Sequence, residues 1–160
     1  MNFPTSVKSG FSNYANFKGR ASRSEFWWFL LFSQLVQMVA QQISGPTASI
    51  TWFALLIPGL SVHVRRLHDS GRSLRWVFWL VASVAGIVLA FVGLLMQTAQ
   101  TIANLDAEQL FDNGSQFWIF VMFVSIVSFM IGFVVNLVFL LMPSDSEMNK
   151  YGPPPAPTTL

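Results

Sequence analysis

The sequence predicts an all-α fold, an integral membrane bundle of four spanning helices with both the N-terminus and the C-terminus in the cytoplasm. Of its 160 residues, 53% are hydrophobic and 10% are charged, whereas about a quarter of the residues of a soluble domain carry a charge. Lys, Arg, Asp and Glu are absent from four apolar stretches, at residues 26–43, 47–64, 76–96 and 117–142. Each stretch is close to or above the roughly 17 to 25 residues that a spanning helix needs. We therefore expect a single four-span membrane domain over residues 1–160, with a cytoplasmic tail at 143–160.

The orientation follows from the basic residues, which all lie on one side of the expected membrane. The nine Lys and Arg residues precede the first stretch, separate the second from the third, or follow the fourth. The other two connections, 44–49 and 97–116, carry no basic residue, and the longer one carries Asp106, Glu108 and Asp112. Because cytoplasmic loops are enriched in Lys and Arg, we expect the basic segments to face the cytoplasm.

The first helix has a recognisable start, and the second has an interruption. Ser22 and Glu25 have the spacing of a capping box, in which each side chain satisfies an unpaired backbone donor. In the second stretch, Pro58 removes one helical hydrogen bond and predicts a kink beside Gly59. The alternative for this stretch is a re-entrant segment. We expect it to span, because otherwise the acidic loop and the C-terminus would exchange sides against the charge rule.

Small residues mark the packing faces of the third and fourth helices. A ridge of small side chains spaced four apart lets two helix backbones approach closely. The residues in question are Ala82, Gly86 and Ala90 in the third helix, and Ser125, Ser128, Gly132 and Asn136 in the fourth. The fourth stretch would be about 39 Å long as a helix, so we expect it to tilt or to protrude from the membrane.

Polar side chains also occur at membrane depth. Gln34, Gln37 and Gln41 follow one side of the first helix, and Asn136 lies in the fourth. Such groups favour the interior of a bundle, where each can find a partner. We interpret them as hydrogen-bonding contacts between helices. The alternative is a polar conduit, which would require an oligomer because four helices enclose only a narrow path.

The cytoplasmic segments contain more arginine than acid. Six arginines, which we call the collar, meet two nearby acids, Glu25 and Asp69; the collar consists of Arg20, Arg23, Arg65, Arg66, Arg72 and Arg75. Since a guanidinium group pairs with a carboxylate or a phosphate, two acids leave about four positive charges without a partner. In one interpretation Glu25 and Asp69 tie the first helix to the inner loop and the other arginines face anionic headgroups. In the other, the collar is a defined site for an anionic ligand, with help from the amides near Gly71 at the start of the third helix.

Catalysis and metal binding are not expected. The chain has no Cys, which excludes disulfides and thiolate ligands. His63 and His68 are five residues apart and so do not share a helical face as a metal-binding pair would. His68 and Asp69 lack an evident nucleophile, and no motif for binding nucleic acid accompanies the basic residues. We expect no enzyme activity, no cofactor, no metal and no nucleic acid partner.

Three cytoplasmic blocks carry a resemblance to a known family. They read FSNYANFKGRASRSEFWWF from Phe11, RRLHDSGRSLRW from Arg65, and NKYGPPP from Asn149. In order and spacing these blocks resemble the signature of a bacterial inner-membrane family catalogued as domain of unknown function 805. The resemblance implies a small multi-pass protein of the bacterial inner membrane and brings no activity with it. The longer, acidic outer loop departs from the family pattern.

The remaining expectations concern the C-terminal tail and the molecules that the collar binds. The prolines after Gly152 cannot continue a helix; we expect the tail to fold back on the collar through Lys150 and Tyr151, the alternative being a flexible or docking segment. The expected function is binding of anionic lipid or of a partner protein by the collar. The alternatives are a small oligomeric channel or transporter lined by Gln34, Gln37, Gln41 and Asn136, and an immunity, defence or stress-response protein that recognises another membrane protein.

Overall fold

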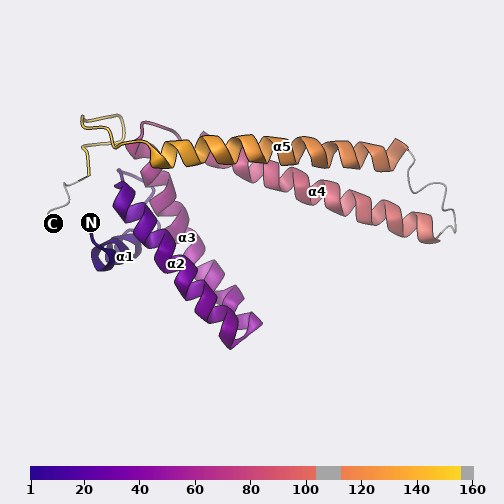
Figure 1. The fold of residues 1–160 in the computed structure, drawn as a ribbon, viewed down its shortest axis with the longest axis horizontal. Helices are drawn as coiled ribbons and strands as arrows, with labels where there is room; N and C mark the ends of the chain where they lie inside the picture. The colour runs from indigo at the N-terminus through magenta and orange to yellow at the C-terminus, as the bar shows by residue number, and fades with distance from the viewer. Residues whose placement is uncertain (104–112, 156–160) are drawn as a thin grey trace. The chain divides into compact units, whose positions relative to one another are not determined.

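The computed structural model describes residues 1–103 and 113–155 and is all-helical over them, as the sequence predicts (Figure 1). Five helices follow one another: α1 (Phe3–Ser12), α2 (Arg23–Ile43), α3 (Gly45–Asp69), α4 (Arg75–Ala103) and α5 (Asn113–Leu141). Helices α2 to α5 correspond to the four apolar stretches. Helix α1 was not predicted. The acidic patch at Asp106, Glu108 and Asp112 lies outside the described residues.

Three of these helices are long and apolar enough to cross a membrane: α3, α4 and the segment Gly114–Leu141 of α5. Helix α2 has 21 residues but is not among them. The physical reason lies in its second half, where Gln34, Gln37, Gln41 and Gln42 lower the mean hydropathy of the helix. Helix α3 continues through Pro58, so the second stretch forms one uninterrupted helix.

The chain forms two compact units. The first consists of Met1–Leu74 with Val138–Leu160, and the second of Arg75–Leu137. In the first unit α2 and α3 lie side by side as a hairpin (Figure 1). The turn is a single residue, Ser44, which ends α2 and whose hydroxyl caps α3 by accepting from the Thr47 amide at 3.3 Å.

The second unit joins α4 to α5 through the small-residue faces that the sequence predicts. A Cβ atom added at Gly86 would lie 2.5 Å from the Ser125 hydroxyl, and one added at Gly132 would lie 2.9 Å from the Trp79 ring. The Trp79 indole N–H donates to the Ser128 hydroxyl at 3.0 Å. Close backbone approach and hydrogen bonds between helices are the two contributions that hold membrane helices together.

Helix α1 packs on α2 through aromatic rings. Phe3 contacts Trp28 edge to face, with ring centres 5.8 Å apart, and Phe11 contacts Phe29 with ring centres 5.7 Å apart. Gly10 permits the approach, because a Cβ at that position would lie 2.2 Å from the Phe29 ring. The α1 sequence has no long apolar run, so the apolar stretches alone do not predict this helix.

The loop after α1 supplies a donor to the carbonyl that lacks its helical hydrogen bond because of Pro58. In a helix the N–H of residue 58 would donate to the carbonyl of Ala54, and proline has no N–H. The Tyr14 hydroxyl donates to the Ala54 carbonyl instead, at 2.8 Å. Three residues beyond the proline, the Ser61 hydroxyl lies 2.8 Å and 2.7 Å from the carbonyls of Asn13 and Asn16. The loop is thus fixed to α3 on both sides of Pro58.

This arrangement predicts coupled effects of Tyr14 and Pro58 on stability. Replacing Tyr14 with Phe should lower the free energy of unfolding in detergent by about 1 kcal/mol, because the Ala54 carbonyl loses its donor. In a Pro58→Ala background the helix supplies its own donor, so the same Tyr14→Phe change should cost much less. Equal costs in the two backgrounds would show that the Tyr14 hydroxyl does not replace the missing helical bond.

Candidate functional site

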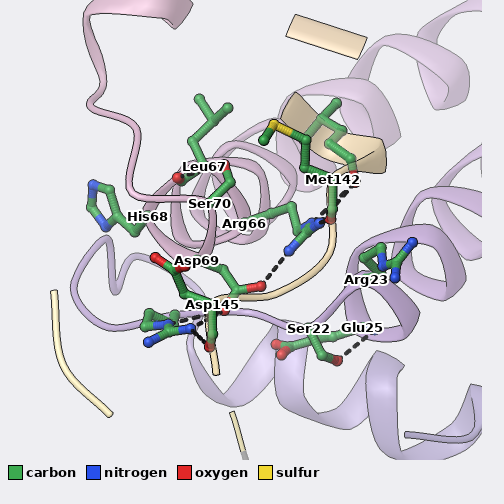
Figure 2. A network of polar contacts seen from close by, with 12 residues as sticks. Ser22, Arg23, Glu25, Arg66, Leu67, His68, Asp69, Ser70, Met142 and Asp145 are labelled. Carbon is green, nitrogen blue, oxygen red and sulfur yellow. Dashed lines mark hydrogen bonds and ion pairs between the residues drawn. The ribbon is translucent and has the colours of Figure 1, made fainter. Parts of the chain in front are cut away.

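The centre of the collar is the buried carboxylate of Asp69, which two arginines share; Figure 2 shows it beside one of them, Arg66. Asp69 and Arg66 both have 0% of their surface exposed, and the Arg20 side chain is 1% exposed. Asp69 Oδ1 accepts from Arg20 Nε at 2.9 Å, and Asp69 Oδ2 accepts from Arg66 Nη1. Asp69 is the last residue of α3, and Arg66 precedes it by one helical turn, so both lie on the same face of α3.

Arg66 also supplies donors to the C-terminal end of α5. Its Nε and Nη2 groups donate to the Leu140 carbonyl at 3.1 and 3.0 Å, and Nη2 also donates to the Met142 carbonyl. The last four carbonyls of a helix have no partner within the helix, and they carry a partial negative charge that favours a cation. Arg66 therefore acts as the cap of a helix that is far away in the sequence.

Arg20 holds the tail in the same way. Its Nη1 group donates to the carbonyls of Glu147 and Gly152 at 2.7 and 3.3 Å, and its Nη2 group donates to the carbonyl of Asp145. The Asp145 amide in turn donates to the Asp69 carbonyl at 3.4 Å. The tail between residues 142 and 152 is thus bound to the end of α3.

The tail folds back on His68, as the sequence analysis expected for Tyr151. The rings of His68 and Tyr151 are stacked, with centres 3.7 Å apart and planes inclined by 7°. The Asn149 side chain donates to the His68 carbonyl at 3.0 Å, and Lys150 lies over the Tyr151 ring at 4.9 Å. Gly71, with a φ of +71°, follows the end of α3 in the left-handed conformation that glycine adopts readily.

The carboxylate at this centre neutralises only one of the two positive charges beside it. Arg20 and Arg66 contribute two positive charges and Asp69 one negative charge, all of them buried. Buried charge is costly unless hydrogen bonds compensate it. The carbonyls at the end of α5 and along the tail supply those hydrogen bonds, so part of the predicted arginine surplus is satisfied by the backbone.

A second buried pair joins α2 to α3. Arg65 Nη1 donates to Glu25 Oε1 at 3.0 Å, and each side chain is 5% exposed. The Ser9 hydroxyl of α1 donates to the same oxygen at 2.8 Å. The Ser22 hydroxyl accepts from the Glu25 amide at 3.2 Å, which is one half of the predicted capping box. The Glu25 carboxylate, which was expected to complete the box, binds Arg65 and Ser9.

The collar therefore divides by exposure. Arg20, Arg65 and Arg66 are buried, whereas Arg23, Arg72 and Arg75 are exposed. Arg23 Nη1 donates to the Leu141 carbonyl at 3.1 Å, and the Arg72 guanidinium lies 4.5 Å from the centre of the Phe139 ring. Both contacts are with the last turn of α5. Arg75 begins α4 and belongs to the second unit.

The intramembrane polar residues do not form one group. Gln34 and Gln37 line a groove between α2 and α3, whereas Gln41 is not part of that lining. Asn136 is 2% exposed and belongs to the second unit; within the described part of the chain, neither atom of its amide has a hydrogen-bond partner.

The histidines do not form part of a metal site in the described residues. His68 Nδ1 faces the Gly19 carbonyl at 3.3 Å, and the His63 ring contacts Phe26 edge to face. Residues 1–103 and 113–155 contain no group of three or more His, Cys, Asp or Glu side chains that could hold a metal ion.

The partners that the backbone provides were not predictable from the sequence. Its carboxylates can be counted as acceptors for the arginines, but nothing in it places the α5 carbonyls beside Arg66. The sequence does contain a signal for the contact that Tyr14 makes. A proline inside a helix leaves the carbonyl four residues earlier without its helical donor, so a donor from elsewhere is expected there.

Removing the shared carboxylate should destabilise the protein strongly. Asp69→Asn leaves Arg20 and Arg66 as two buried like charges, so we expect a loss of about 3 to 5 kcal/mol in the free energy of unfolding. Asp145→Asn is the matched control: this exposed residue makes hydrogen bonds to Arg20 and Asp69 through its backbone, and the change should cost under about 0.5 kcal/mol. Thermal unfolding in detergent measures both. Equal losses would contradict the role of Asp69.

Comparison with known proteins finds a family and relatives that are named as inner membrane proteins. The family model described as Protein of unknown function (DUF805) matches residues 14–105. Inner membrane protein YhaI of Escherichia coli K12 is 38% identical over 85 residues, which cover 48% of this chain and 72% of YhaI. Inner membrane protein YhaH of the same strain is 31% identical over 91 residues, 50% of this chain and 75% of YhaH.

The family match includes Tyr14, Arg20, Glu25, Arg66 and Asp69, whereas the tail block from Asn149 lies beyond it. No solved structure matches the chain. The three helices able to cross a membrane and the inner-membrane relatives together place the protein in the bacterial inner membrane. The chain belongs to the family described as Protein of unknown function (DUF805).

Proposed function

We propose that this is a non-enzymatic protein that binds anionic lipid headgroups at the cytoplasmic face of the inner membrane through Arg23 and Arg72. The observation that carries the proposal is the division of the collar. Arg20, Arg65 and Arg66 are buried and bonded, whereas Arg23 and Arg72 are exposed and contact a carbonyl and an aromatic ring. Neither contact neutralises the charge, so a phosphate can still pair with both guanidinium groups.

The proposed topology has four spans with both termini in the cytoplasm. It is supported by the one-sided distribution of basic residues. At 21 residues α2 is about 31 Å long, which matches the hydrocarbon core of roughly 30 Å. Because α2 and α3 form a hairpin, the start of α2 and the end of α3 lie at the same end of it, so Arg23 and Arg72 belong to one side of the membrane.

The position of these arginines favours lipid over a soluble anion. Both contact the last turn of α5, a helix long and apolar enough to cross the bilayer. A basic side chain at such a helix end lies at headgroup depth, where each Lys or Arg contributes about 1 kcal/mol to the attraction of anionic lipid. Arg72 on Phe139 further combines a cation with an aromatic ring, as expected at a membrane interface.

Lipid retention tests the proposal. Native mass spectrometry of the purified protein, exchanged into mixed phosphatidylglycerol and phosphatidylcholine, should show a preference for phosphatidylglycerol. Arg23→Gln with Arg72→Gln should reduce that preference roughly thirtyfold, if each arginine contributes about 1 kcal/mol.

Lys8→Gln with Lys18→Gln is the control, because it removes the same charge from two exposed lysines near α1. It should leave most of the preference intact. An unchanged preference in the arginine variant, or an equal loss in the lysine control, would reject a defined lipid site. Loss of a single crosslinked membrane protein with lipid retention unchanged would assign the arginines to a protein partner instead.

A further inference from the structure

The loop between α1 and α2 is joined to the side of α3, at a distance from the end of that helix. The Ser61 hydroxyl lies 2.8 Å from the Asn13 carbonyl and 2.7 Å from the Asn16 carbonyl. Along the helix axis, Ser61 is about 12 Å from Asp69, the last residue of α3. The backbone of the loop therefore lies alongside α3, well before the end that carries the collar.

This position lies within the membrane when α3 crosses it. Helix α3 is long and apolar enough to cross, and its 25 residues measure about 37 Å, whereas the hydrocarbon core is roughly 30 Å thick. A helix that crosses the core completely can then protrude by about 7 Å at most. Even when this whole excess protrudes at the collar end, Ser61 lies about 5 Å inside the core and Ala54 about 15 Å inside it. The Ala54 carbonyl is the one that accepts from the Tyr14 hydroxyl, at 2.8 Å.

The polar side chains of the loop are bonded within the protein. The Ser12 hydroxyl and the Asn13 amide nitrogen both donate to the Ser9 carbonyl, at 3.1 and 3.0 Å. The Asn16 amide nitrogen donates to the Asn13 side-chain carbonyl at 3.0 Å, and the Tyr14 hydroxyl donates to α3. Polar groups at membrane depth need partners inside the protein, because lipid chains offer none. Each polar side chain from residue 12 to residue 16 has such a partner.

The aromatic side chains of the same segment are exposed. Phe11, Tyr14 and Phe17 have 42%, 38% and 40% of their surface accessible. The loop thus directs hydrogen-bonding groups toward the protein and leaves apolar rings on the outside, which is the reverse of a loop surface in water. At the depth of Ser61 and Ala54, the surroundings of the protein are the acyl chains of lipids.

We propose that the segment from Phe11 to Phe17 is inserted into the membrane, with its aromatic rings among the phospholipid acyl chains of the leaflet on the collar side. Helix α1 then lies along the membrane interface and packs on α2, as an interfacial helix does. The segment before the first apolar stretch is thus part of the membrane domain. The inference depends on α3 crossing the membrane, and Arg23 and Arg72 have no part in it.

Spin labels on the full-length chain test the insertion, and the absence of Cys from the sequence allows a single labelled site in each variant. Ala15→Cys and Phe17→Cys place a nitroxide at two exposed positions of the loop. Ala15→Cys keeps all three rings, so it tests the proposal even where Phe17→Cys fails to fold. Each variant is reconstituted in vesicles of phosphatidylglycerol and phosphatidylethanolamine. Electron paramagnetic resonance then compares relaxation of the label by oxygen, which dissolves in hydrocarbon, with relaxation by a water-soluble nickel complex.

Two reference positions calibrate the comparison. Phe53→Cys, at a residue of α3 that is 65% exposed and precedes Ala54, reports lipid; Met148→Cys, at a tail residue that is 76% exposed, reports water. The ratio of oxygen to nickel relaxation at both loop positions should resemble that at Phe53. It should exceed the ratio at Met148 by at least about tenfold, because a polar solute is excluded from hydrocarbon.

A ratio at Ala15 that matches the Met148 reference, with the Phe53 label in lipid, would overturn the proposal. A Phe53 label that nickel reaches would show that α3 does not cross the membrane, and the proposal would fail with it. The variant Arg23→Gln with Arg72→Gln separates this inference from the lipid-headgroup site, since it should leave the label at Ala15 unchanged. A shift of that label into water in the arginine variant would contradict the independence of the two lipid contacts.

Discussion

The structure depends on one buried charge arrangement, in which Arg66 joins the carboxylate of Asp69 to the carbonyl end of α5. A guanidinium group offers five N–H donors in a plane, and Arg66 uses donors on all three of its nitrogens. Arg20 extends the same centre to the tail. Four separate parts of the first unit thus meet at α3: the loop before α2, the end of α3, the end of α5 and the tail.

The arginines of the collar differ in their roles: some are buried and structural, and others are exposed. Positive charge near a membrane is usually read as an orientation signal, but a fully buried arginine cannot contact a headgroup. Arg20, Arg65 and Arg66 are better explained as structural cations that satisfy carboxylates and helix ends. Arg23 and Arg72 lie at the surface of the same centre, which fixes their positions while leaving their charges available.

The sequence was sufficient for the all-α class and for the helices that carry long apolar runs. Composition and the four uncharged stretches predicted α2 to α5, and the small residues near Gly86 and Gly132 predicted how α4 meets α5. It was insufficient for α1, whose contacts with α2 are scattered aromatic pairs. It was also insufficient for the site, because the acceptors of Arg20 and Arg66 are backbone carbonyls that only the fold brings near. Counting acids against arginines therefore overestimated the free charge.

Arg66 is required for its geometry and not for its charge alone. The substitution Arg66→Lys separates the two, since lysine keeps the charge but cannot reach Asp69 and the α5 carbonyls together. We expect Arg66→Lys to lower the free energy of unfolding by at least about 2 kcal/mol, while Arg23→Lys at the exposed position changes it by under about 0.5 kcal/mol. Equal stability of the two lysine variants and the natural chain would contradict this expectation.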